Sequence, residues 1–184
     1  MRCITMRVAV AVALLMALTT LARAGTLQAI EFYNAALDHY FVTAEPGEIA
    51  ALDSGRFEGW MRTGFTFNTS GAPESGAQPV CRFFGAFGAL SSHFYTPFTA
   101  ECASTLADPH WTLESSAAFY VVVPAADGSC GAGLAPVYRL YNDGQGGAPN
   151  HRYTTDLAIR AQMIAKGWVP EGIGPDAVQM CAPQ

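Results

Sequence analysis

Along residues 30–173, short runs rich in aromatic and β-branched residues alternate with turns built from Gly, Asn, Asp and Pro. Such runs are typical of β-strands, and two runs joined by a polar turn predict a hairpin. Three hairpins are predicted, over residues 30–34 with 38–43, 80–85 with 92–96, and 137–142 with 150–154. Consecutive strand residues point to opposite faces, so one member of each apolar pair is expected to be buried and the other available. These pairs are Phe32 with Tyr33, Phe83 with Phe84, and Leu140 with Tyr141.

After each hairpin comes a short segment with helix-start and helix-stop signals. In the last of them, Thr155 or Asp156 can cap a helix and Gly167 can end it in a left-handed conformation. We therefore expect helices over residues 48–53, 99–107 and 157–166. A tryptophan then opens one more predicted strand each time, over residues 60–67, 111–123 and 168–173.

The same order of motifs recurs three times along the chain. The matching histidines are 54 and 58 residues apart, and only His110 is left without a counterpart. The residues that recur are Trp60, Trp111 and Trp168, together with His39, His93 and His151. Tryptophan is rare, so three of them in register indicate an internal repeat of about 50 residues.

The predicted fold class is α+β, mainly β, in a single domain over residues 25–184. It contains three ββαβ repeats, at about 29–70, 77–123 and 135–182, linked by the Gly/Pro/Ser-rich residues 70–79 and 124–136. A unit of this size cannot bury its apolar face alone, so the three are expected to share one core around a pseudo-threefold axis. Both a trefoil-like form and a small propeller-like disc satisfy this pattern.

The N-terminal 24 residues have the pattern of a signal peptide. Arg2 and Arg7 precede an apolar run over residues 8–21, and the Ala-Arg-Ala triplet at 22–24 fits a cleavage site. The run has 14 residues, which is short of the ~20 needed to span a membrane as a helix. We therefore expect residues 1–24 to be removed and the mature protein to be secreted or periplasmic.

The composition excludes several classes of protein. With 51% hydrophobic and 14% charged residues, the chain is neither a disordered tail nor a coiled coil. Removal of residues 1–24 takes away three arginines and no acidic residue, which leaves 7 basic against 15 acidic side chains and a formal net charge of −8. The remaining cations are scattered, so neither nucleic acid nor an anionic membrane is an expected partner.

Four cysteines remain in the predicted mature chain, and an even number in an exported protein indicates disulfides. Four cysteines allow three connectivities; we favour Cys81 with Cys102, joining a strand to a nearby helix, and Cys130 with Cys181, tying the last third of the chain to the C-terminus. No C-x-x-C or H-x-x-x-H spacing occurs, so we expect neither a metal centre nor a cofactor.

The F-Y-N, H-F-Y-T and G-W-x-x-E-G elements resemble a repeat family of exported bacterial and fungal proteins, catalogued as a domain of unknown function and often found next to secreted hydrolases. The resemblance covers residues 29–182 and implies a stand-alone exported repeat protein without a specified activity. The residues that match the motif are His39, Tyr40, Thr43, His93, Tyr95, Thr96, His151, Tyr153 and Thr154.

The first copy departs from the other two at a pair of charged positions. Arg82 and Arg139 are expected to pair with Glu114 and Glu171, respectively, whereas the first copy has Glu31 and Thr63 at these places. One hypothesis is that the first copy reverses the polarity and pairs Glu31 with Arg62. Arg62 is one residue out of register, which in a strand would point it to the opposite face.

The repeated histidines allow two interpretations. His39, His93 and His151 could converge as a three-histidine metal site of a hydrolase, or Glu114 and Glu171 could act as an acid/base pair. The interpretation we favour is that each histidine anchors its hairpin, because the adjacent Tyr and Thr recur as faithfully and no carboxylate that would orient a metal ligand is evident.

The tryptophans also allow two interpretations, packing in the core or stacking on sugar rings. Three exposed copies would give avidity along a polysaccharide. We expect a non-catalytic binding module for a cell-wall or extracellular polysaccharide or another surface component, helped by Asn34 and Asn142. A small hydrolase and a structural envelope protein that binds other chains are the alternatives, and the oligomeric state stays open. The candidate binding residues are His39, Tyr40, Trp60, His93, Tyr95, Trp111, His151, Tyr153 and Trp168.

Overall fold

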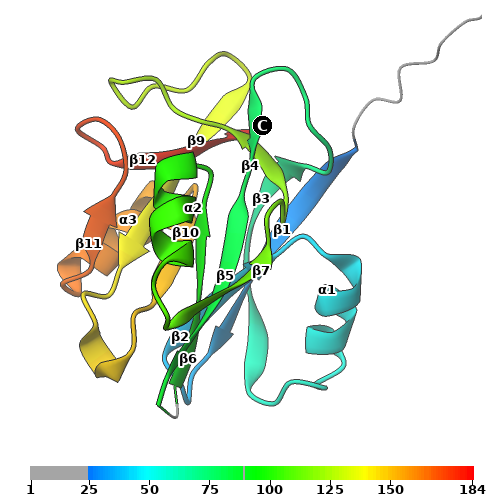
Figure 1. Cartoon of the computed structure of the whole chain (residues 1–184), viewed down its shortest axis with the longest axis vertical. Helices are drawn as coiled ribbons and strands as arrows, with labels where there is room; N and C mark the ends of the chain where they lie inside the picture. The colour runs from blue at the N-terminus through cyan, green and yellow to red at the C-terminus, as the bar shows by residue number, and fades with distance from the viewer. Residues whose placement is uncertain (1–24, 89) are drawn as a thin grey trace, which may run out of the picture.

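The computed structural model describes residues 25–88 and 90–184. The predicted signal peptide over residues 1–24 lies outside the described residues. Figure 1 shows the arrangement of the elements. The strands are β1 (Thr26–Asn34), β2 (His39–Thr43), β3 (Trp60–Ser70), β4 (Ala77–Pro79), β5 (Cys81–Phe87), β6 (Leu90–Thr96), β7 (Trp111–Ser115), β8 (Tyr120–Val122), β9 (Leu134–Tyr141), β10 (His151–Thr154), β11 (Val169–Glu171) and β12 (Val178–Pro183). The helices are α1 (Pro46–Asp53), α2 (Thr99–Leu106), α3 (Leu157–Ala165) and the short 3-10 helix η1 (Gln145–Gly147).

The fold is mostly antiparallel β with three short α-helices, which confirms the predicted class. The order strand, strand, helix, strand occurs in segment one (residues 26–70), segment two (residues 77–122) and segment three (residues 134–183). The first long strand of each segment is central: β1 pairs with β2 and β3, β5 with β6 and β7, and β9 with β10 and β11. β5 alternates buried and half-buried residues and so buries one face, whereas β1, β9 and β10 contain runs of consecutive buried residues and are covered on both faces.

Two further strands connect the segments. β12 pairs with β9 and β8, and β8 also pairs with β3 and β4, so strands of all three segments meet in one sheet. The β6–β5–β7 sheet stands beside it, and β2, β6 and β10 contact one another. The main core lies between the sheets and includes Phe32, Tyr95, Phe119 and Val137.

The helices follow the local signals in the sequence. Asp156 caps α3, since its carboxylate accepts hydrogen bonds from the amides of Ala158 and Ile159. Gly167 follows with a φ of 89°, as predicted for a glycine stop. α1 begins two residues earlier than predicted, at Pro46, because proline suits the first turn of a helix. No helix among the described residues is long and apolar enough to cross a membrane.

The last strands of the segments differ from their predicted bounds. The strand predicted over residues 111–123 is two strands, β7 and β8, because the Ser115 hydroxyl accepts a hydrogen bond from the Ala117 amide and the chain turns there. The strand predicted over 168–173 is only three residues long, since the chain turns at Gly172 and Gly174 before β12. The last strand of segment one, β3, extends to Ser70, beyond its predicted end at residue 67.

Both predicted disulfides are present. Cys81 of β5 is bonded to Cys102 of α2, and Cys130, in the loop before β9, is bonded to Cys181 of β12. The first disulfide fixes a helix against the central strand of segment two. The second closes the C-terminal strand onto the connection between segments two and three.

Candidate functional site

The strand register identifies which residues of the three hairpins occupy the same place. Tyr33 pairs with Tyr40, Phe84 with His93 and Tyr141 with His151. Tyr40, and not His39, is therefore the counterpart of His93 and His151. The predicted equivalence of His39 with the other two histidines is wrong by one residue, and one residue in a strand reverses the face of the side chain.

His93 and His151 each line a cleft, described below, whereas His39 lines neither of them. His39 pairs with Asn34 and is buried, and burial lowers the pKa of its ring despite a hydrogen bond to the backbone of Ser91. Among the described residues, no three His, Cys, Asp or Glu side chains form a group suited to a metal ion.

A first cleft of about 320 Å³ opens between segments one and two. Five aromatic side chains line it, four from β2, β3, β5 and β6 and one from the loop between α1 and β3, and the helix α1 adds Leu52. The ring centroids of Phe41 and His93 are 4.5 Å apart, and those of Phe41 and Trp60 are 6.0 Å apart. The aromatic residues on the strands are Phe41, Trp60, Phe84 and His93, and the one in the loop is Phe57.

Charged side chains back the first cleft. Glu114 Oε2 lies 3.3 Å from His93 Nε2 and 3.0 Å from Arg82 Nε. The terminal nitrogens of the same guanidinium bond both carboxylate oxygens of Glu48 on α1, at 2.8 and 2.7 Å. Arg82 thus joins a carboxylate of its own segment to one from the neighbouring segment.

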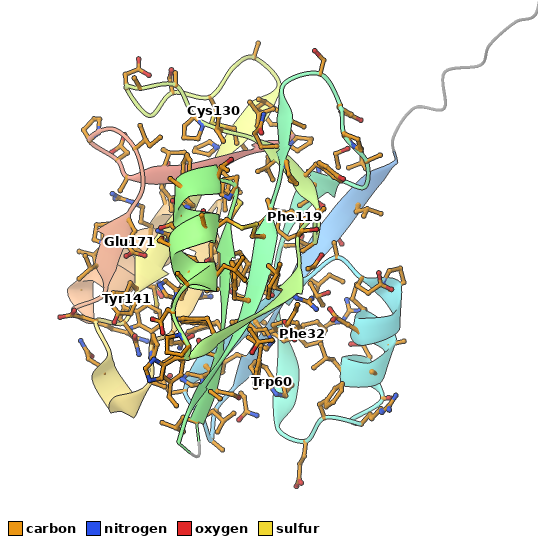
Figure 2. The ribbon with its side chains drawn as sticks, in the orientation of Figure 1. Phe32, Trp60, Phe119, Cys130, Tyr141 and Glu171 are labelled. Carbon is orange, nitrogen blue, oxygen red and sulfur yellow. A yellow bond between two sulfur atoms is a disulfide. The ribbon has the colours of Figure 1, made fainter. Side chains whose placement is uncertain are left out.

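A second cleft of about 300 Å³ repeats this arrangement between segments two and three. The ring centroids of Phe94 and His151 are 5.0 Å apart, and Tyr141 stacks on His151 with a centroid distance of 4.9 Å. Phe87 also lines this cleft, and four of its aromatic residues stand at the strand positions of the four strand residues in the first cleft: Phe94, Trp111, Tyr141 and His151. In Figure 2, Tyr141 and Glu171 lie to the left of α2, whereas Trp60 lies on the side of α1.

The charged groups behind the second cleft also match. Glu171 Oε2 lies 3.4 Å from His151 Nε2 and 2.8 Å from Arg139 Nε, and Arg139 bonds both oxygens of Glu101 on α2, at 2.9 and 2.7 Å. His151 Nδ1 is buried without a hydrogen-bond partner.

All four glutamates at the clefts favour the ionised form. Burial raises the pKa of Glu114 and of Glu171, but hydrogen bonds from the histidines and the arginine charges outweigh it and leave each pKa below its usual value. Burial acts likewise on Glu48 and Glu101, and bonds from Arg82 and Arg139 again lower the net pKa. A general acid needs a raised pKa, so these carboxylates are suited to accepting hydrogen bonds and cations.

The interface between segments three and one is closed. Arg152 stands at the strand position of Phe41 and Phe94, and its guanidinium forms two hydrogen bonds of 2.8 Å with Glu31. The guanidinium lies 4.3 Å from the ring centroid of Tyr40, and its Nη1 is 3.5 Å from Met163 Sδ. Trp168 is only 7% exposed here, whereas Trp60 and Trp111 are partly exposed.

The hypothesis that Glu31 pairs with Arg62 is wrong. Arg62 is exposed and bonds Asp53 at 2.6 and 2.7 Å. Glu31 instead pairs with Arg152 of another segment, and both side chains are buried. The first segment therefore does carry the acidic member of an ion pair where the other segments carry an arginine, but its basic partner comes from segment three. Arg62 cannot be that partner, because it lies on the other face of β3.

Several residues predicted to bind ligand are in the core. Tyr95 and Tyr153 are buried, where the Tyr95 hydroxyl donates to the carbonyl of Val42 and the Tyr153 hydroxyl donates to that of Tyr95. Asn34 and Asn142 are buried and bind their own hairpin loops. Neither pair reaches the clefts.

Sequence reasoning missed Glu48 and Glu101. Each is the third residue of its helix, so the first-turn acidic position was the available signal, although it is usual for any helix. Ile159 has this place in α3, and the closed interface accordingly lacks the second glutamate.

A comparison with known families finds one match, which covers most of the chain. The model of a domain of unknown function, DUF5648, matches residues 15–122 and again residues 122–178, consistent with a repeat family. No curated protein and no solved structure matches the chain. The protein therefore belongs to the family of the domain of unknown function DUF5648.

Proposed function

We propose that the protein is an exported, non-catalytic binding module that holds a polysaccharide in the two aromatic clefts between its segments. The observation that carries this proposal is the recurrence of one aromatic set, with Trp60 and Trp111 partly exposed, at the same strand positions of two clefts. Flat aromatic faces bind the apolar faces of sugar rings, and hydrogen-bond acceptors beside them fix hydroxyl groups.

We also infer that the three segments are repeats around a pseudo-threefold axis. Three features support this arrangement: the recurring order of elements, the mutual contacts of β2, β6 and β10, and the matching register of the hairpins. The axis would run between these three strands and place one interface between each pair of repeats. Two of these interfaces are open and one is closed.

Export is supported by the two disulfides, which persist in oxidising compartments. The N-terminal residues 1–24 have the composition of a signal peptide, so the proposed location is the periplasm or the medium. A polysaccharide of the cell wall or of the surroundings is available in either place.

The test is co-sedimentation of the purified protein with insoluble cell wall and a panel of polysaccharides. We expect Trp60→Ala and Trp111→Ala each to weaken binding about 10²-fold, because the loss of one cleft removes avidity. The double variant should not bind. Met61→Ala and Thr112→Ala are matched controls, since both residues are exposed neighbours of the tryptophans and line neither cleft.

The outcome that contradicts the proposal is binding that is unchanged in the double variant, verified as folded by circular dichroism. Failure of the unmodified protein to bind any polysaccharide would also contradict it. Trp168→Ala is not a suitable probe, because Trp168 is buried and its loss would destabilise the fold.

A further inference from the structure

The charges accessible in the first cleft are negative. Glu48 and Glu114 line it and are each 30% exposed, whereas Arg82, which neutralises one of them, is 14% exposed and lies behind them. Among the described residues, His93 is the only other titratable side chain that lines this cleft. One negative charge therefore remains uncompensated by this set of side chains.

The second cleft has the same imbalance. Glu171 lines it and is 31% exposed, whereas Arg139, which pairs with both Glu171 and Glu101, is 5% exposed and is not part of the lining. Asp108, which lies 2.9 Å from the ring nitrogen of the exposed His110, adds a further carboxylate to the lining. An anionic ligand would be repelled by both clefts, and a neutral ligand would not use this charge.

The aromatic walls favour a cation as well. The π face of an aromatic ring attracts ammonium and guanidinium groups, and the attraction is strongest for Trp. Trp60 and Phe84 face the first cleft, and Trp111 and Phe87 face the second, with their rings 5.3 Å apart in the latter case. Each cleft thus combines π faces with excess carboxylate.

The closed interface already contains a cation in such surroundings. The guanidinium of Arg152 lies over Tyr40 and, at 5.6 Å, over Phe65, while both of its bonds to carboxylate oxygens go to Glu31. Tyr40 has the strand position of His93 and His151, and Met163 has the helix position of Leu52 in the first cleft. The guanidinium of Arg152 therefore fills the third interface, and it lies beside residues that match residues lining the clefts.

We propose that each open cleft binds a protonated amine carried on a sugar ring, so that the ligand is a polymer of amino sugars with free amino groups. This inference rests on the proposed function and specifies its ligand. The ring would stack on Trp60 or Trp111, and the ammonium group would lie against Glu114 or Glu171. The net charge of −8 of the predicted mature chain favours the approach of such a polycation.

The test is isothermal titration of the unmodified protein with two oligosaccharides of equal length, one of glucosamine and one of N-acetylglucosamine. Acetylation removes the charge and leaves the ring, so we expect the glucosamine oligomer to bind at least about tenfold more tightly. Glu114→Gln with Glu171→Gln should abolish this preference. Glu74→Gln, which removes an exposed charge outside both clefts, is the matched control.

The outcomes separate this inference from the proposed function. Equal binding of the two oligomers, or tighter binding of the acetylated one, would overturn the amine preference and leave polysaccharide binding intact. Binding of neither oligomer, nor of any other saccharide, would overturn both. Tight binding of poly-lysine without binding of the glucosamine oligomer would overturn the amino sugar in favour of a basic peptide. The comparison of ligands uses the unmodified protein, so it holds even if a variant fails to fold.

Discussion

The open clefts and the closed interface are built at the same strand positions and have opposite outcomes. In the clefts, an arginine of the central strand joins two glutamates and a phenylalanine lines the wall. In the closed interface, Glu31 replaces the arginine and Arg152 replaces the phenylalanine. Arg152 is long enough to reach Glu31 and also to cover Tyr40, so one side chain takes the room that a ligand could use.

The comparison shows that exchanging the acidic and basic members of an ion pair also changes the strand from which the arginine extends. The cleft arginines start from the central strand and leave their phenylalanines free to line the surface, whereas Arg152 starts from the wall itself. Ile159 and Met163 of α3 complete the closure with apolar contacts, and both are buried. The closed interface therefore contributes to stability, and the clefts leave polar and aromatic groups available.

The largest effect is expected from breaking the closed interface at its buried pair. Glu31→Gln leaves the guanidinium of Arg152 without a charged partner in the core, and we expect a loss of about 3–5 kcal/mol in the free energy of unfolding. Chemical denaturation measures it. Glu114→Gln is the matched change in the first cleft, where Arg82 keeps Glu48 and the site is partly exposed, so its cost should stay below about 1 kcal/mol.

The double variant Glu31→Met with Arg152→Met separates the cost of an unpaired charge from the strength of the pair. An apolar replacement of both partners is often nearly neutral, so it should recover most of the stability that Glu31→Gln loses. Equal destabilisation by Glu31→Gln and Glu114→Gln would refute the distinction between the two kinds of interface.

The next largest effect is expected at Met163, which lies beneath Arg152 and is 1% exposed. Met163→Ala should cost about 3 kcal/mol, because it leaves a cavity in the closed interface. Thr105 has the same helix position in the second cleft and is only partly buried, so Thr105→Ala should change stability by less than about 0.5 kcal/mol. Similar unfolding midpoints for the two variants would contradict the prediction.

Features set by neighbouring residues could be predicted from the sequence. The two disulfides, the order of the elements and the start of α3 at its Asp156 cap follow from spacing and local hydrogen bonding. The alternation of Phe83 with Phe84 was also informative, since Phe83 is fully buried and Phe84 lines the first cleft. Period-two patterning needs no knowledge of the other segments.

Features that depend on pairing between strands or segments could not be predicted. His39 was aligned with the other histidines by residue type, but the segment from His39 to Thr43 is one residue longer than that from His93 to Thr96. Only the strand register shows where the extra residue lies. The arginine partners of Glu31 and of Glu48 come from other segments, and local patterns carry no information on these contacts.

A smaller effect, limited to one cleft, is expected at Gly85. A Cβ atom there would lie 2.5 Å from a ring atom of Phe87 and 2.7 Å from one of Trp111. Gly85→Ala should cost about 1–3 kcal/mol and displace Trp111, so that the second cleft loses its ligand while the first keeps it. Gly131→Ala is the control, since its nearest atom would be 4.0 Å away. Loss of both binding events in titrations would show that the clefts are not independent.

The smallest effect is expected from protonation of the second cleft. Burial lowers the pKa of His151 below the ordinary value of 6.5, so between pH 6.5 and the lower folded-state pKa the unfolded chain binds more protons. Stability is therefore full above about pH 6.5 and falls on acidification by at most about 1.4 kcal/mol per pH unit. Tyr40, at this position in the closed interface, has a pKa raised by burial above its ordinary value of 10.0 and does not titrate in this pH range. His151→Gln should flatten the decline in unfolding midpoints between pH 7 and 5.5, and an unchanged slope would assign the acid sensitivity to other groups.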